Sequence, residues 1–181
     1  MIRRVLSKPI TWVVLALLGV GGAGGLYWFQ PWRLVTDTTV TDTLSVETSV
    51  APRPSVSSSK PAAPPAPAAV VLARGSFVTH EHDTAGTARV VRNADGSHQL
   101  ELVGLSTSDG PDLRVWLSDQ PVSRDGWHVF DDGRYAELGR LKGNHGNQVY
   151  RLRSGIDPSD FSSVSIWCKR FSVSFGAAAL T

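Results

Sequence analysis

Residues 163–176 read Ser-Val-Ser-Ile-Trp-Cys-Lys-Arg-Phe-Ser-Val-Ser-Phe-Gly, and this stretch decides the fold. Its first half alternates apolar and small polar residues with a period of two, which is typical of a β-strand. Val164, Ile166 and Cys168 therefore share one face of the strand. Ser163, Ser165 and Trp167 share the other face.

Beyond Arg170 the alternation shifts by one residue, so that the apolar set becomes Phe171, Val173 and Phe175. Such a shift requires either a β-bulge or a tight turn at Lys169–Arg170. We favour the bulge, because Lys-Arg is a poor pair for a primed turn that needs positive φ at both central residues. In a two-residue hairpin, Cys168 would instead lie opposite Phe171. Both arrangements predict that the two apolar sets point into the core.

Cys168 is the sole cysteine, so the chain has no internal disulfide. Its predicted inward position leaves two interpretations open. It is either a small buried hydrophobic residue, or a redox thiol or ligand.

Length and charge limit the class of protein. The chain has 181 residues and 41% apolar content, which predicts one domain with appendages. The net charge of +2 arises from the first 72 residues, because from Ala73 onward 12 basic residues face 13 acidic ones. The domain therefore has no basic excess, and we expect no nucleic-acid partner.

The N-terminal region predicts a membrane span. Residues 9–32 contain no charge and are long enough to cross a bilayer as a helix. Arg3, Arg4 and Lys8 precede this run, so we expect residues 1–8 inside the cell and the C-terminal domain outside it, in a single-pass membrane protein. The alternative is a cleaved signal peptide, with small residues at Ala23-Gly24-Gly25.

Residues 33–72 differ in composition, with Pro, Ser, Thr and Ala predominating. The Pro/Ala half predicts an extended, disordered stalk that holds the domain away from the membrane. Val and Leu alternate within residues 36–50, which could pack on another surface.

Residues 73–181 predict an all-β domain, an antiparallel β-sandwich or small barrel of about eight strands. Turn signals such as Asn93-Ala94-Asp95-Gly96 and Asp131-Asp132-Gly133 separate short strand-like runs. The predicted strands cover residues 76–80, 87–92, 98–105, 113–118, 135–139, 148–152, 163–168 and 171–177.

A few polar and aromatic residues are candidate site residues. Asp112 begins a strand, where it could orient a ligand, although we favour hydrogen bonds to the turn backbone. Lys142 lies in a Gly-containing hairpin. Trp167, Trp116 and Tyr150 are candidate neighbours of Cys168.

His80 and His82 lie at i and i+2, which on a strand places both imidazoles on one face. No third ligand has an evident spacing, so we favour solvated histidines at a sheet edge over a metal site. The sequence also has no nucleophile elbow or Ser/His/Asp arrangement. We therefore expect a protein that is not an enzyme by itself.

The order of several short motifs resembles the DM13 domain family over residues 73–181. The resemblance is carried by Gly75-Ser76-Phe77, Gly86-Thr87-Ala88, Gly110-Pro111-Asp112-Leu113, Leu141-Lys142-Gly143, and the stretch from Ser163 through Trp167-Cys168 to Phe175. It implies an extracytoplasmic β-rich domain of electron transfer or oxidative modification at cell surfaces. In that proposal the family cysteine, here Cys168, acts as a bare thiol or holds a group such as haem.

Two functions follow from these observations. The chain is a membrane-tethered redox module in which Cys168 exchanges electrons with an unidentified envelope partner, or it is a non-catalytic binding or scaffold module in which Cys168 is structural.

Overall fold

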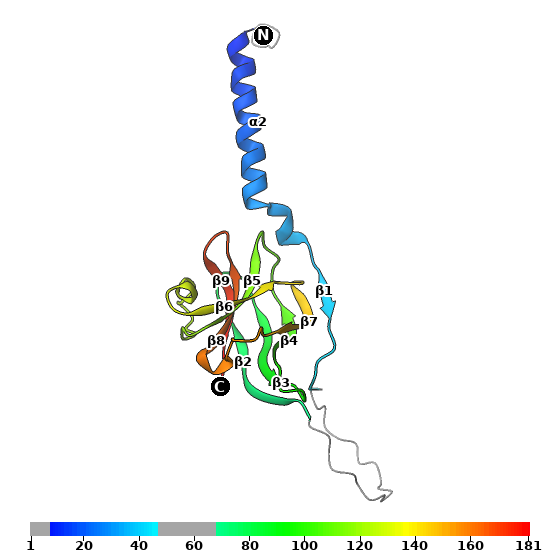
Figure 1. The fold of residues 1–181 in the computed structure, drawn as a ribbon. Helices are drawn as coiled ribbons and strands as arrows, with labels where there is room; N and C mark the ends of the chain where they lie inside the picture. The colour runs from blue at the N-terminus through cyan, green and yellow to red at the C-terminus, as the bar shows by residue number, and fades with distance from the viewer. Residues whose placement is uncertain (1–7, 47–67) are drawn as a thin grey trace, which may run out of the picture.

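The structure is a computed structural model that describes residues 8–46 and 68–181, and its main body is one nine-stranded sheet (Figure 1). The strands are β1 (Thr39–Thr41), β2 (Val70–Thr79), β3 (Ala85–Arg92), β4 (His98–Ser106), β5 (Leu113–Ser118), β6 (Tyr135–Arg140), β7 (His145–Arg151), β8 (Ser163–Cys168) and β9 (Val173–Ala179). Short 3-10 helices η1 (Pro31–Val35), η2 (Val129–Asp131) and η3 (Pro158–Asp160) connect them.

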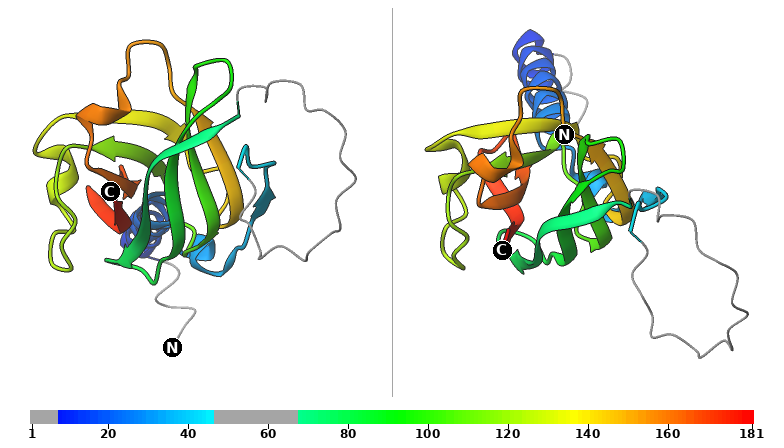
Figure 2. Two further views of the ribbon diagram at one scale, coloured as in Figure 1. Left: turned by 90° about the horizontal axis from the view of Figure 1, so that it is seen from below. Right: turned by 60° about the horizontal axis from the view of Figure 1, so that its bottom comes forward.

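The strand order is β1-β7-β4-β3-β2-β9-β8-β5-β6, and the sheet curls into a half-barrel (Figure 2). β2 makes the curl continuous, because its first part pairs with β3 and its last residues pair with β9. All pairings are antiparallel except that of β1 with β7, which makes the sheet mixed. The predicted β-rich fold is confirmed, with β1 as an additional strand.

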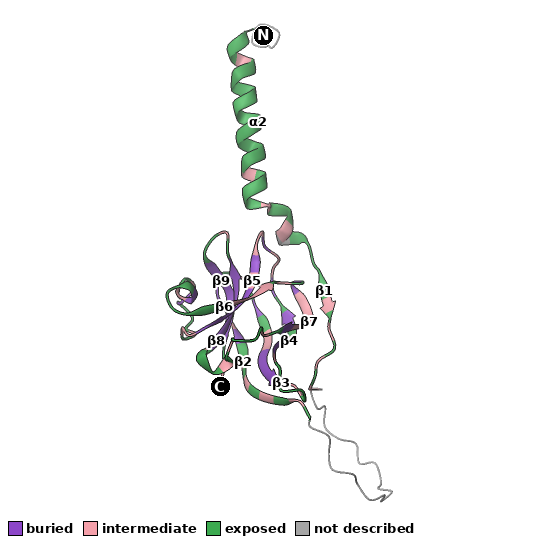
Figure 3. Cartoon of the chain, in the orientation of Figure 1, coloured by how far each residue is buried: buried purple, intermediate pink, exposed green. Residues whose placement is uncertain are grey.

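Helix α2 (Pro9–Phe29) is the long apolar helix that the sequence predicts. It extends away from the domain, and its side chains are exposed along almost its whole length (Figures 1 and 3). The apolar span from Pro9 to Arg33 has 25 residues, which is long enough to cross a membrane.

The segment that follows α2 packs against the domain. β1 lies beside β7, and the backbone N–H of Ser45 donates to Glu101 Oε1 at 2.6 Å. The alternating stretch after Thr36 thus has a packing partner, the outer surface of the sheet. The Pro-rich half of the predicted stalk, residues 52–67, lies outside the described residues.

β8 and β9 form a hairpin with a four-residue turn, Lys169–Ser172, so the favoured β-bulge is wrong. The turn has two residues more than we considered, and Ser172 supplies the positive φ of 50°. Lys169 and Arg170 therefore need no left-handed backbone. Cys168 faces Val173, and Phe171 lies in the turn with 39% of its surface exposed, contrary to its predicted burial.

The other five residues of the two apolar sets are buried in the main core inside the curl. A second, smaller cluster lies on the opposite face of β5, β8 and β9. It contains Trp116, Phe130, Trp167 and Ala177, and the segment between β5 and β6 covers it. Both faces of β8 are therefore buried, with Val164, Ile166 and Cys168 in the main core and Trp167 in the second cluster.

Candidate functional site

Cys168 is the last residue of β8 and is completely enclosed. It lies opposite Val173 of β9 and Leu113 of β5, and its exposed fraction is 0%. These three residues belong to the main core. The sequence-based prediction that Cys168 lies on the core side is confirmed.

Burial raises the pKa of the Cys168 thiol, and the negative charge of Asp112 adds to this effect. The backbone N–H groups of Phe171, Arg170 and Asp112 oppose it without cancelling it. The thiol is therefore protonated at neutral pH. A protonated, enclosed thiol is a poor nucleophile, so the geometry does not favour attack by a free thiolate.

Asp112 connects the turn before β5 to the β8–β9 hairpin. Its carboxylate accepts from Arg114 Nε at 2.8 Å and lies 3.5 Å from Arg140 Nη2. Its backbone oxygen accepts from the N–H of Lys169 at 3.0 Å. The side chain thus binds arginine, where the sequence favoured hydrogen bonds to the turn backbone. It places a negative charge close to the thiol.

Trp167 points away from the side chain of Cys168 and into an aromatic stack. Its ring centroid lies 5.0 Å from that of Trp116 at an interplanar angle of 23°. Trp116 in turn stacks on Tyr135 at 4.1 Å and 9°. Phe130 meets Trp167 edge-on at 6.3 Å. Because Tyr135 is 47% exposed and Trp116 only 3%, the stack runs from the surface to the residue beside Cys168.

The indole N–H of Trp116 is buried and has no hydrogen-bond partner within the described residues. Leaving a buried donor unpaired is costly, so the ring is held by its stacking and packing contacts. Tyr135 and Phe130 were not among the predicted site residues. The sequence could have indicated Tyr135, because this residue begins the predicted strand that comes directly after the strand containing Trp116.

His80 is buried, so the favoured interpretation of solvated edge histidines is wrong for it. Its Nδ1 lies 2.9 Å from Ser174 Oγ, and its Nε2 lies 3.0 Å from the backbone oxygen of Ser123. Ser165 Oγ donates to Ser174 Oγ at 3.0 Å. Burial lowers the pKa of His80, so this network contains a neutral imidazole.

The described residues contain no cluster of three or more His, Cys, Asp or Glu side chains able to hold a metal ion. His82 lies apart from His80 and packs its ring on Phe175, with a centroid distance of 4.0 Å. The pair at i and i+2 therefore has two separate packing roles.

Lys142 and Tyr150 lie together. The Tyr150 hydroxyl donates to Gln148 Oε1 at 2.7 Å and accepts from the backbone N–H of Lys142 at 3.0 Å. Lys142 Nζ donates to Asp42 Oδ2 at 2.5 Å and lies over the Tyr150 ring. Although Tyr150 belongs to the same core as Cys168, its hydroxyl points to this cluster, which fastens the segment after β1 to the sheet.

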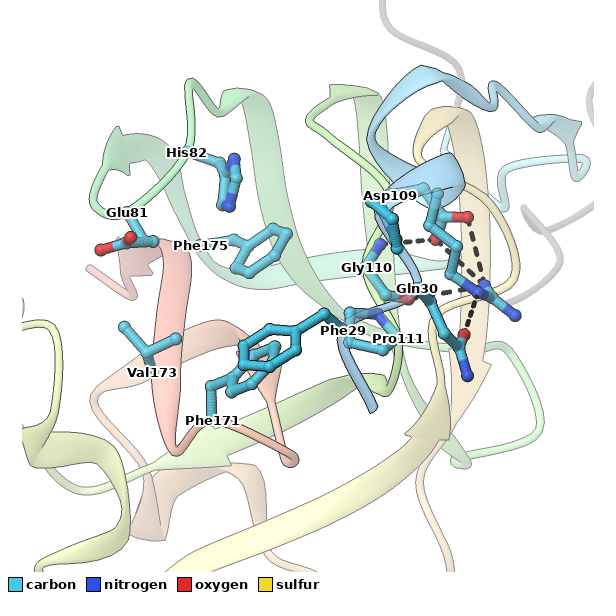
Figure 4. Close-up of a pocket in the computed structure, with 12 residues that line it drawn as sticks. Phe29, Gln30, Glu81, His82, Asp109, Gly110, Pro111, Phe171, Val173 and Phe175 are labelled. Carbon is cyan, nitrogen blue, oxygen red and sulfur yellow. Dashed lines mark hydrogen bonds and ion pairs between the residues drawn. The ribbon is translucent and has the colours of Figure 1, made fainter. Parts of the chain in front are cut away.

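A pocket of about 470 Å³ lies where α2 meets the domain (Figure 4). Its walls come from the end of α2 and the start of η1, the turn at residues 109–111, residues 81–82, and the β8–β9 hairpin. Val173, which lines this pocket, is the residue opposite Cys168. We call it the α2 pocket.

The residues around Cys168 do not fit a haem. A ligating sulfur requires an adjoining cavity for the porphyrin, but Leu113, Val173 and Phe175 fill the same core as Cys168. Cys168 lines neither the α2 pocket nor four other pockets found on the described part of the chain.

Comparison with known proteins agrees with the architecture. No curated protein and no solved structure matched the chain. The family model described as "Electron transfer DM13" matches residues 76–180, which span β2 from its middle to the end of β9 and include Cys168. This match covers more than half of the chain, and the chain therefore belongs to the DM13 family, whose domain is an electron-transfer module.

Proposed function

We propose that this protein is a membrane-tethered, extracytoplasmic module that passes single electrons between Cys168 and a partner docked at Tyr135. The observation that carries the proposal is the aromatic stack of Tyr135, Trp116 and Trp167, which leads from the surface to the residue next to Cys168. Indole and phenol rings are the protein side chains that lose one electron most readily after thiols, and close contact between rings favours transfer.

The tether rests on α2. Its 21 residues extend about 31 Å at 1.5 Å per residue, which matches the hydrocarbon core of a bilayer. Arg3, Arg4 and Lys8 precede the helix in the sequence, and this asymmetry favours an N-terminus inside the cell. The domain then lies outside the cytoplasm, with the hairpin turn facing the membrane.

The redox step involves one electron and one proton. A one-electron oxidant, such as a high-potential metal centre of the partner, takes an electron from Tyr135, and the electron of Cys168 refills the stack through Trp167 and Trp116. The S–H bond of Cys168 breaks to give a thiyl radical, and its proton is released to solvent. Transfer in the other direction reduces the thiyl radical and returns the proton to sulfur.

The complete burial of Cys168 favours a second candidate, a binding or scaffold module of the cell envelope in which the cysteine is only part of the core. The two candidates differ in what oxidation at the surface does to the thiol. In the scaffold, an oxidant at Tyr135 leaves Cys168 unchanged.

Photo-oxidation of the full chain in detergent micelles separates the two candidates. A photogenerated ruthenium(III) polypyridyl complex serves as the oxidant, and the remaining thiol is titrated after unfolding in urea. We expect wild type to lose its thiol with each oxidising flash, and Trp116→Leu to lose it severalfold more slowly. The matched control is Trp127→Phe, because Trp127 packs outside the stack and its Nε1 bonds to the Arg124 backbone. A thiol that survives the flashes in wild type would favour the scaffold, and equal thiol loss in all three proteins would contradict the route through Trp116.

A further inference from the structure

The α2 pocket has the size of a small-molecule site. Its volume of about 470 Å³ falls within the range of roughly 300–1,000 Å³ of ligand pockets. Four segments far apart in the sequence build it, and α2 contributes one wall through Phe29, Gln30 and Pro31. In the membrane-tethered arrangement, the end of α2 lies at the lipid–water interface, so the pocket opens there.

Two pairs of aromatic rings line the pocket, one stacked and one tilted. Phe29 and Phe171 stack with centroids 5.8 Å apart at 23°, and His82 covers Phe175 at 4.0 Å and 38°. Figure 4 shows both pairs along one side of the pocket. Aromatic walls of this kind prefer a planar ring, which can stack on them, to a flexible chain.

Polar groups lie at the two opposite ends of the pocket (Figure 4). At one end, Arg33 donates from Nε to Gln30 Oε1 at 2.9 Å and from Nη1 to Asp109 Oδ2 at 3.2 Å. Its other terminal nitrogen, Nη2, has no hydrogen-bond partner within residues 8–46 and 68–181.

At the other end lies the imidazole of His82, whose ring nitrogens make no hydrogen bond within the described part of the chain. Burial lowers the pKa of His82, so the ring is neutral at neutral pH and presents one N–H donor. The pocket therefore combines aromatic walls with a donor group at each end that is unpaired among the described residues, Arg33 Nη2 beside the Asp109 carboxylate and His82 beside that of Glu81.

We propose that the α2 pocket binds the ring of a lipid-soluble quinone. A quinone is planar and carries carbonyl acceptors on opposite sides of its ring, which fit Arg33 and His82, while its apolar tail extends into the bilayer. A lipid acyl chain would leave both donors unused. The inference rests on the proposed function, because it needs the membrane tether, and it adds a second redox partner, which binds beside Val173 and not at Tyr135.

The test uses the full chain in phosphatidylcholine nanodiscs with an azido-benzoquinone that carries a decyl tail. After illumination, the labelled peptides are identified by mass spectrometry, and the half-saturation concentration is measured. We expect saturable labelling of residues 29–33 or 171–175, and we expect decylubiquinone but not decanol to compete.

Three variants and a control sharpen this test. His82→Phe keeps an aromatic ring at this position but removes its N–H donor, and Phe171→Ala removes an exposed aromatic side chain of the pocket wall. Each variant should raise the half-saturation concentration of the quinone about tenfold, which corresponds to the loss of one good contact. Leu72→Ala removes an exposed apolar side chain of β2 away from this pocket and should have no effect. Cys168→Ser should also label like wild type, because binding does not require the thiol.

The results distinguish this inference from the proposed function. Equal competition by decanol would make the pocket a groove for lipid chains. If the protein resists alkaline extraction from membranes but shows no saturable labelling, the quinone assignment is overturned and the tether stands. Extraction at alkaline pH would instead contradict the tether. Saturable labelling without photo-oxidation of the thiol would support the pocket and contradict the Cys168 route.

Discussion

Replacing Cys168 tests whether the thiol is enclosed as the structure has it. In Cys168→Ala, the core loses one heavy atom similar in size to a methylene, worth about 0.8 kcal/mol of transfer free energy. The cavity left behind adds to this, so we expect a loss of about 1–2 kcal/mol in the free energy of unfolding. In Cys168→Ser, a buried hydroxyl without partners would cost about 1–3 kcal/mol. The backbone N–H groups of Phe171, Arg170 and Asp112 surround the sulfur, so we expect the lower end of that range.

The pH dependence of this difference gives a second measure. Because the pKa of Cys168 is raised on folding, the unfolded chain releases its thiol proton first as the pH increases. The thiol therefore makes its full contribution to stability below the ordinary thiol pKa of about 8.5. Above this pH, the free energy of unfolding of wild type falls by up to about 1.4 kcal/mol per pH unit relative to that of Cys168→Ala. The difference in free energy of unfolding between wild type and Cys168→Ala should therefore shrink from about pH 8 to about pH 10, because the thiol of the unfolded chain ionises near its ordinary pKa of roughly 8.5.

The assay is urea unfolding of the full chain in detergent micelles, followed by intrinsic fluorescence, together with the rate at which a disulfide probe reacts with the thiol. We expect the thiol to react far more slowly in the folded protein than in urea, since the probe must wait for the hairpin to open. A folded protein whose thiol reacts as fast as the unfolded chain, or whose advantage over Cys168→Ala grows with pH, would refute the enclosed, protonated thiol.

Three further substitutions test the framework, each by urea unfolding in micelles. Glu101→Gln breaks an ion pair whose carboxylate is fully buried and should cost about 3–5 kcal/mol, whereas the control Glu137→Gln acts on a partly exposed pair and should cost about 0–1 kcal/mol. Gly75→Ala would bring a Cβ into the backbone oxygen of Ala179 and should cost about 3 kcal/mol or more, because the strands must separate; a neutral effect would contradict the register. Hydrogen bonds lower the pKa of Asp42, so its stabilisation is present above its unfolded pKa and is lost as the pH falls through the lower, folded pKa. Asp42→Asn should therefore be less stable than wild type at pH 7, and the difference should shrink as the pH falls below the ordinary Asp pKa of about 3.9.

The sequence predicts the strands and the position of Cys168 because both depend on local alternation. Val164, Ile166 and Cys168 form one buried face, and the period of two identifies that face without knowledge of its partners. The same pattern does not determine the length of a turn. The structure uses four residues with Ser172 at positive φ, and this leaves Phe171 outside the core.

The aromatic stack and the α2 pocket were beyond sequence reasoning, because both form between segments that are distant along the chain. Trp116 meets Trp167 only because β5 pairs with β8, and Phe29 meets Phe171 only because α2 ends beside the hairpin. The alternating stretch after Thr36 was similarly ambiguous, since its partners, β7 and Glu101 of β4, are distant from it in the sequence. The pairing of strands that are distant in the sequence must be known before these ring contacts can be predicted.

One turn links the enclosed thiol to the end of α2. Arg170 donates to the backbone oxygens of Tyr27 and Trp28 at 3.1 and 2.7 Å, where the end of the helix carries partial negative charge. Lys169 bonds to the backbone of Asp112, and Phe171 forms a wall of the α2 pocket. The turn thus contacts the helix, the pocket and the strand end that holds Cys168. A ligand that displaces Phe171 must act on the same four residues that cover the thiol, so binding at the pocket and access to Cys168 are expected to be coupled.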